Sequence, residues 1–208
     1  MWPRAVLFDL DGVLVKSEEA WFLTLEEAGK KFRGRAITRE EFMPTFGQGT
    51  AADVKAFEFN CTPAELDAFY RDEFVKRVPS IWVNPDAKRV LAGLKQTGRK
   101  CAVVTNSIAP VAKRLLEQAQ VSGDFDTVVT ADQVVNAKPA PDLVLKACSA
   151  LGLMPVDTWL VGDSRFDLGA ARAAGAYFVG FGIDGDARVD KLDALLALLQ
   201  NAATGLKK

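Results

Sequence analysis

Residues 5–12 read AVLFDLDG, an apolar run that ends abruptly in two carboxylates and a glycine. Four apolar residues in a row, bounded by polar ones, are typical of a buried parallel strand at the point where it leaves its sheet. The stretch therefore predicts a first strand over residues 5–8. Asp9 and Asp11 follow it directly, so acidic side chains are expected at the carboxyl end of this strand.

Downstream of residue 84 the sequence alternates between short apolar runs and helix-compatible segments. Asn84 and Pro85 are expected to open the first of these helices. Strands are predicted near 101–104, 127–130, 159–161 and 177–179, and helices near 109–119, 141–151, 166–174 and 192–199. Repeated strand–helix units imply a parallel sheet covered on both faces. The predicted fold class is α/β, with a Rossmann-like parallel-sheet core.

Residues 16–83 carry helix signals and no strand signals. An amphipathic pattern over 17–32 has Ser17 as its candidate N-cap, and Thr38 and Thr62 each begin a capping-box pattern. The segment 50–59 is also compatible with a helix. We therefore predict a core built from residues 1–15 and 84–208, and an all-helical cap domain, residues 16–83, inserted after the first strand.

Composition excludes several classes of protein. The 208 residues hold 26 Lys and Arg against 27 Asp and Glu, a net charge of −1, which argues against nucleic acid as a partner. No run approaches the ~18 apolar residues that a membrane helix needs, so no membrane partner and a cytoplasmic location are expected. The absence of His excludes imidazole bases and ligands. Proton transfer is left to other side chains, carboxylates first among them.

Three groups of polar residues follow apolar runs and a fourth precedes a helix, and we expect the parallel strands to bring all four to one edge of the sheet. Besides the two first-strand carboxylates these groups are Thr105, Asn106 and Ser107, then Lys138, then Asp163 and Asp167. Carboxylates, a hydroxyl and a lysine suit phosphoryl transfer. Clustered acidic oxygens bind a hard cation such as Mg²⁺, which can bridge to a phosphate oxygen.

These stretches resemble the four motifs of the haloacid dehalogenase-like hydrolase superfamily, in its phosphatase branch with a helical cap (phosphoglycolate phosphatase and beta-phosphoglucomutase-like members). They read FDLDGVL at 8–14, VVTNS at 103–107, KPAPD at 138–142 and VGDSRFD at 161–167, in the family's order. The resemblance covers essentially the whole chain. It implies a Mg²⁺-dependent phosphoric monoester hydrolase that works through an aspartyl-phosphate intermediate.

The resemblance also implies catalytic roles. Asp9 would be the nucleophile and Asp11 the proton donor to the leaving group. Thr105 and the Asn106 amide would hold phosphoryl oxygens, and Lys138 would neutralise the charge that develops on them.

The implied metal ligands are Asp9, Asp11 through its backbone carbonyl, and Asp163. Asp167, one helical turn beyond Asp163, is expected to be a direct or an indirect ligand.

Substrate choice is expected to lie in the cap. The candidate specificity loop is formed by Gly47, Gln48, Gly49 and Thr50. Arg35, Arg39 or Lys55 could contact a substrate carboxylate or second phosphate, although the simpler interpretation of each is an exposed residue on a solvated helix face. The expected partner is a small phosphorylated metabolite, of the phosphoglycolate or sugar phosphate class, and the protein is expected to be a monomer or homodimer.

Two other functions remain open at this point. A phosphosugar mutase of the beta-phosphoglucomutase type is one, although such enzymes look to a His early in the cap and this chain has Trp21 near that place. A non-catalytic phosphometabolite-binding module is the other, and it is disfavoured because all the acidic motif residues are present.

Overall fold

A six-stranded parallel sheet forms the centre of the computed structural model, which describes residues 2–204. Its strand order is β5-β4-β1-β6-β7-β8, so the first strand lies in the middle. The strands are β1 (Ala5–Phe8), β4 (Lys100–Thr105), β5 (Thr127–Thr130), β6 (Thr158–Gly162), β7 (Tyr177–Phe181) and β8 (Ala187–Val189). Every neighbouring pair is parallel, which confirms the predicted α/β class.

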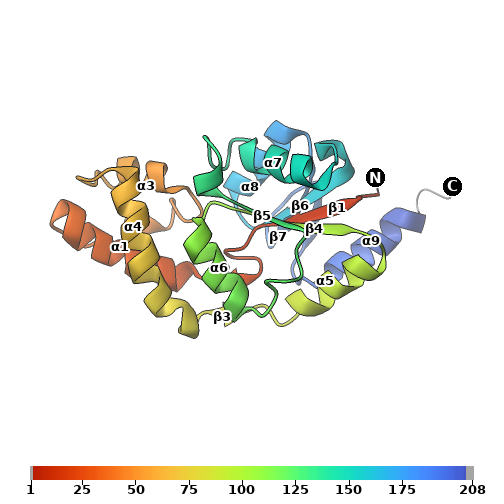
Figure 1. Cartoon of the computed structure of the whole chain (residues 1–208), viewed down its shortest axis with the longest axis horizontal. Coiled ribbons are helices and arrows are strands. Elements are labelled where there is room, and N and C mark those ends of the chain that lie inside the picture. Colours follow the sequence, from red (N-terminus) through yellow and green to blue (C-terminus); the bar gives the residue numbers. More distant parts are fainter. Residues whose placement is uncertain (1, 205–208) are drawn as a thin grey trace.

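Helices cover both faces of this sheet (Figure 1). One face carries α5 (Ala87–Gln96), α6 (Ala109–Gln118) and α9 (Ala194–Thr204), and the other carries α7 (Asp142–Leu151) and α8 (Arg165–Ala174). Residues of β1 alternate between the two cores, with Val6 and Phe8 in one and Ala5 and Leu7 in the other. Both faces of the strand are therefore apolar, and its polar residues are confined to its carboxyl end.

The segment between β1 and α5 is mostly helical and forms a separate group of helices at one end of the molecule (Figure 1). It contains α1 (Glu18–Arg33), α2 (Arg39–Phe42), α3 (Thr50–Ala56), α4 (Pro63–Phe74) and the 3₁₀ helix η1 (Val75–Ser80). The predicted capping boxes at Thr38 and Thr62 are both formed. Buried aromatic rings pack these helices together; among them are Phe42, Phe57, Tyr70 and Phe74.

The all-helical prediction for residues 16–83 is wrong at its two ends. Val15–Lys16 (β2) and Trp82–Val83 (β3) pair as a short antiparallel ribbon where the chain enters and leaves the helical group. Two-residue strands are too short to show any alternation of apolar and polar residues, so the sequence carried no signal for them.

Other differences are local. The helix expected to open at Asn84 begins at Ala87, because the Asn84 side chain instead bonds to the Val13 carbonyl and to the Asp86 amide. Strand β8 was not predicted, nor were the 3₁₀ turns η2 (Ala131–Gln133) and η3 (Pro155–Asp157). Ser17 precedes α1 as expected, but its hydroxyl caps nothing and bonds to Asp11 instead. Within residues 2–204, no helix is long and apolar enough to cross a membrane.

Candidate active site

Three adjacent strands bring the motif residues together. In the order β4-β1-β6, Thr105 ends the first strand, Asp9 follows the second and Asp163 follows the third. The Asp9 amide still donates to the Val161 carbonyl at 2.9 Å, which fixes the start of the β1 turn against β6. The topology thus places side chains that are more than 150 positions apart in sequence at one sheet edge.

Lys138 ties two of the carboxylates together. Its Nζ lies 2.8 Å from Oδ1 of Asp9 and 2.6 Å from Oδ1 of Asp167, and it also donates to the Val104 carbonyl at 3.1 Å. The lysine side chain is 1% exposed and that of Asp167 is 0% exposed. The buried ammonium therefore has three oxygen acceptors. It links the Asp9 carboxylate to Asp167 in α8 and to the Val104 carbonyl in β4.

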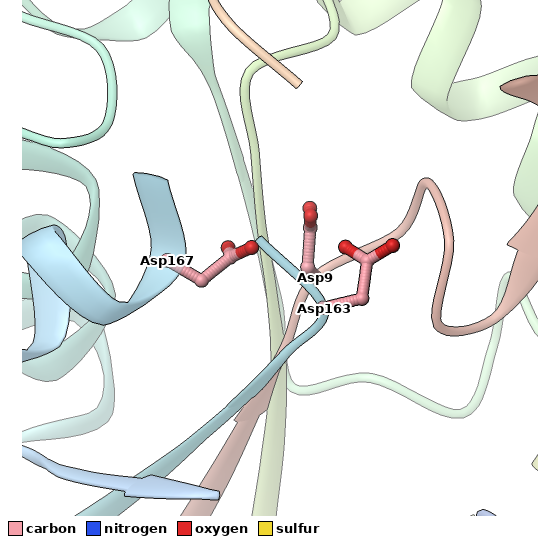
Figure 2. A group of neighbouring side chains, drawn as sticks. All are labelled: Asp9, Asp163 and Asp167. Carbon is pink, nitrogen blue, oxygen red and sulfur yellow. The ribbon is translucent and has the colours of Figure 1, made fainter. Parts of the chain in front are cut away.

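Asp163 completes an acidic cluster with Asp9 and Asp167. One carboxylate oxygen from each of the three lies within 4.8 Å of the others, and Figure 2 shows the three carboxyl groups turned toward a common space. Gly12 makes room for Asp163, because a Cβ at that glycine would lie 1.8 Å from Oδ2 of Asp163. The glycine has φ +86°, a conformation that other residues rarely adopt.

The charges of this cluster do not balance without a further cation. Burial raises the pKa of Asp9 well above its usual range and Asp167 raises it further, against the opposing charge of Lys138. Burial, and then Asp167, raises the pKa of Asp163 to about 7. Burial alone would lower the pKa of Lys138, but the two carboxylates outweigh burial and raise it. Two buried carboxylates and the part-buried Asp163, facing one ammonium, fit a divalent cation with oxygen ligands.

Asp11 lies in a different environment from Asp9. Its Oδ1 accepts hydrogen bonds from the Ser17 hydroxyl and, at 2.9 Å, from the Trp21 indole Nε1. Its Oδ2 accepts from the Ser107 hydroxyl at 2.7 Å and from the Thr105 hydroxyl at 3.5 Å. The side chain of Asp11 is thus held by uncharged donors and lies outside the group of carboxylates that could share a metal ion in the described structure.

Thr105 and Asn106 are both placed at the site. The Thr105 hydroxyl also accepts from the Ser107 amide at 3.0 Å. The Asn106 side chain does not face an empty space, because its Nδ2 donates to the carbonyls of Gly47 and Lys138, at 2.9 and 3.0 Å, and its Oδ1 accepts from the Lys138 amide. Asn106 therefore joins the lysine loop to the cap.

The predicted specificity loop lies directly over these residues. A pocket is lined on the core side by Asp9, Asp11, Thr105 and Asn106 among others, and on the cap side by Gly47, Gln48 and Thr50. Gly49 is turned away from it, toward Ala137, whose Cβ would lie 2.9 Å from a Cβ at position 49. Arg35, Arg39 and Lys55 do not line this pocket: Arg35 is paired with Glu41, Arg39 with Glu19, and Lys55 is exposed.

Several residues at the site were not predicted to act there. Ser17 bonds to Asp11, and Asp53 and Tyr70 line the cap side of the pocket. Ser164 caps α8 and donates to Oδ2 of Asp167 at 2.5 Å. Ser107 was expected at this strand end but without a role, and it bonds to Asp11. Asp53 had no signal in the sequence, because a single acidic residue in a helical pattern normally faces water.

The fold and these motif residues define a hydrolase of a known class. A model of the haloacid dehalogenase-like hydrolase family matches residues 6–181, and the chain belongs to that family. It is similar to the phosphoglycolate phosphatase of Salmonella choleraesuis, with 32% identity over 204 residues, 85% of this chain and 80% of that protein. It is also similar to the pyrophosphatase PpaX of Bacillus cereus, with 25% identity over 215 residues, 95% of this chain and 97% of that protein.

A solved structure supports the same assignment of the fold. The beta-phosphoglucomutase of Clostridium difficile superposes with a TM-score of 0.83 at 19% identity, over 93% of each chain. The relatives named above are phosphatases, so the predicted phosphatase branch of the family is confirmed.

Proposed function

We propose that the protein is a Mg²⁺-dependent phosphatase that hydrolyses a small organic phosphate monoester, of the phosphoglycolate or sugar phosphate class, through an aspartyl-phosphate on Asp9. The observation that carries the proposal is the contrast between the two motif carboxylates. Asp9 lies beside Lys138 and two further carboxylates, whereas Asp11 is held by hydroxyl groups and an indole. Two carboxyl groups in such different surroundings are suited to two different chemical roles.

Asp9 is the nucleophile in this proposal. Its Oδ1 is engaged by Lys138 and by the Leu10 amide at 2.7 Å, which leaves Oδ2 to attack phosphorus. The new bond joins Oδ2 to phosphorus as the ester oxygen departs. The ammonium of Lys138 offsets the repulsion between the carboxylate and the incoming phosphate, and it opposes the rise in the pKa of Asp9 that burial and Asp167 cause.

Asp11 moves the proton. It gives a proton to the departing ester oxygen, and it later takes a proton from the water that attacks the aspartyl-phosphate, so that both carboxyl groups return to their starting states. The hydroxyl of Ser107 and the indole of Trp21 hold its two oxygens in place during both steps. Phosphate and the free alcohol are the products.

The metal ligands in this proposal are Asp9, Asp163 and the Asp11 backbone carbonyl, with Asp167 beside them. Mg²⁺ at this position would supply positive charge to the phosphoryl oxygens. The oxygen-only donor set and the excess of buried negative charge fit that ion. Asp167 already bonds to Lys138 and Ser164, so its first role is to orient the lysine.

The test is phosphate release from p-nitrophenyl phosphate and a panel of small phosphate monoesters, with Mg²⁺ and then with EDTA. We expect turnover that needs Mg²⁺, that Asp9→Asn abolishes, and that Asp11→Asn slows without weakening Mg²⁺ binding. Circular dichroism checks that both variants are folded. Unchanged turnover in Asp9→Asn would exclude the aspartyl-phosphate, and no release from any ester would favour a mutase or a binding module.

A further inference from the structure

Within residues 2–204, the pocket above the motif residues is lined by acidic side chains without any basic ones. Among the described residues that line it there is no Lys or Arg, and there are three carboxylates. Two of these, Asp9 and Asp11, belong to the reaction. The third is Asp53 of α3, which comes from the cap. The other lining side chains on the cap side are aromatic, aliphatic or uncharged polar groups: Trp21, Leu25, Phe42, Thr45, Phe46, Gln48, Thr50 and Tyr70.

Asp53 is a buried carboxyl group with only uncharged donors. It is 6% exposed, its Oδ1 accepts from Nε2 of Gln48 at 2.8 Å and its Oδ2 accepts from the Tyr70 hydroxyl at 2.8 Å. No Lys or Arg of the described chain forms a salt bridge with it. A buried carboxyl group that is not paired with a cation lowers the stability of the fold, so packing alone does not explain the presence of Asp53 at this position.

A chain of contacts links Asp53 to the reacting end of the pocket. The Tyr70 ring packs edge-on against Trp21, with ring centroids 5.1 Å apart, and Trp21 donates to Asp11. On the other side, Gln48 follows Gly47, whose carbonyl accepts from Asn106. Asp53 therefore faces the part of the pocket that lies beyond the phosphoryl site, where the leaving group of a substrate must sit.

Three arginines of the cap are paired away from the pocket. Arg33 and Arg35 both bond to Glu41, and Arg39 bonds to Glu19 and stacks on the Phe22 ring. At the site itself Lys138 is already engaged by Asp9 and Asp167. A second anionic group on the substrate would therefore meet carboxylates and aromatic faces, with no Lys or Arg among the described lining residues to pair with it.

We propose that Asp53 makes this pocket select phosphate monoesters whose leaving group carries no negative charge, and that the pocket excludes phosphoglycolate and pyrophosphate. This inference rests on the proposed phosphatase function and narrows its substrate class to polyhydroxyl compounds such as sugar phosphates. The oxygens of Tyr70 and Gln48 remain free to accept from substrate hydroxyl groups while their hydrogens point to Asp53, and the aromatic rings suit the C–H face of a sugar. The chain would thus differ in substrate from the relatives named for glycolate and pyrophosphate.

A matched series of three esters tests this charge selection. 2-Hydroxyethyl phosphate, 2-aminoethyl phosphate and phosphoglycolate (carboxymethyl phosphate) have nearly the same size and differ in the charge at the far end. Binding is measured by calorimetry at pH 8, where the Asp53 carboxyl group is ionised, with Mg²⁺ present and in the Asp9→Asn variant, which cannot turn the esters over in the proposed mechanism. We expect the hydroxyethyl and aminoethyl esters to bind at least tenfold more tightly than phosphoglycolate.

The role of Asp53 itself is tested by adding Asp53→Asn to that variant. The amide of Gln48 can turn to accept from the new Asn, so the packing is kept. We expect phosphoglycolate binding to improve about tenfold and that of the hydroxyethyl ester to change less than threefold. Asp72→Asn removes the same charge from an exposed site on α4 and is the matched control. It should leave all three affinities unchanged.

Each outcome is decisive. Phosphoglycolate binding as tightly as the hydroxyethyl ester, or no binding of any of the three, would overturn the proposal. An Asp53→Asn variant that binds phosphoglycolate no more tightly than its Asp9→Asn parent does would overturn the assignment to Asp53. Because these are binding measurements, they do not depend on turnover. Failure of the phosphatase proposal is instead read from phosphate release in the unmodified protein.

Discussion

Nε1 of Trp21 donates a hydrogen bond of 2.9 Å to Oδ1 of Asp11, and this bond joins the first helix of the cap to the turn that follows β1. The Ser17 hydroxyl bonds to the same oxygen from the start of that helix. Ser107 and Thr105 bond to the other oxygen from the end of β4. The carboxyl group that we assign to proton transfer is thus oriented jointly by the cap and the core.

Replacing Trp21 by Phe tests this coupling. The aromatic ring can still pack against Tyr70 and Phe74, but the bond to Asp11 is lost. Asp11 gains its negative charge as it gives up its proton, and a hydrogen bond to a charged group contributes about 1.5–3 kcal/mol, so kcat should fall by about tenfold or more, with KM within about threefold. Steady-state kinetics with p-nitrophenyl phosphate measure both.

The matched control for this change is Trp82→Phe, because Trp82 lies in β3 and is 47% exposed. It should leave kcat unchanged. An undiminished kcat in Trp21→Phe would mean that Ser17, Ser107 and Thr105 orient Asp11 without the indole.

Most of the core could be predicted from the sequence because its strands are short apolar runs that end in polar residues. That pattern located β1, β4, β5, β6 and β7 and placed Asp9, Thr105 and Asp163 at their carboxyl ends. Strand β8 has no such pattern: Ala187–Val189 is three residues long and contains Arg188, so its pairing with β7 depends on tertiary contacts.

The cap side of the site could be predicted only in part. The loop at 47–50 was a candidate because the family resemblance places substrate choice in the cap, and three of its four residues line the pocket. The role of Asp53 depends on Gln48, five positions earlier in the loop before α3, and on Tyr70, 17 positions later, which meets Asp53 only through the packing of α3 on α4. The candidate cations Arg35 and Arg39 were plausible by residue type, but Glu41 and Glu19 hold them away from the pocket.

Lys138→Met should destabilise the fold as well as abolish turnover. Removing a buried lysine leaves Asp9 and Asp167 facing each other without a counter-charge, and breaking such a group costs about 3–5 kcal/mol. Urea unfolding at pH 7.5 measures the change. The control is Lys76→Met, which breaks the exposed pair with Glu73 and should cost less than about 1 kcal/mol. Equal losses in the two variants would show that the burial of Lys138 has no energetic consequence.

Gly12→Ala should displace Asp163 and so weaken Mg²⁺ binding. The new Cβ would lie 1.8 Å from Oδ2 of that carboxylate, and the backbone has φ +86°. Gly98→Ala separates the two effects, because Gly98 has φ +74° with nothing within 4 Å of its Cβ position. Both variants should lose about 1–2 kcal/mol of stability to backbone strain. Only Gly12→Ala should lose Mg²⁺ affinity by calorimetry; equal affinities would show that Asp163 can move without cost to the site.

Asp53→Asn should change the free energy of unfolding in a pH-dependent way. Compared with the unmodified protein, the variant should gain stability as the pH rises. Burial raises the pKa of Asp53 to about 7, from an ordinary value of 3.8, so the folded state holds this proton more tightly than the unfolded state does. The stability that the protonated group contributes is fully present below about pH 4 and is lost as the pH rises toward 7. Asn has no proton to lose. The difference in free energy of unfolding between variant and unmodified protein should therefore shift in favour of the variant by about 1–4 kcal/mol between pH 4 and pH 8.

Urea titrations across this range measure the difference, in which the other titrating groups cancel. Asp72→Asn should show no such gain toward alkaline pH, because Arg71 lowers the pKa of that exposed carboxyl group. Parallel pH curves for Asp53→Asn and the unmodified protein would show that Asp53 stays charged in the folded state across the whole range.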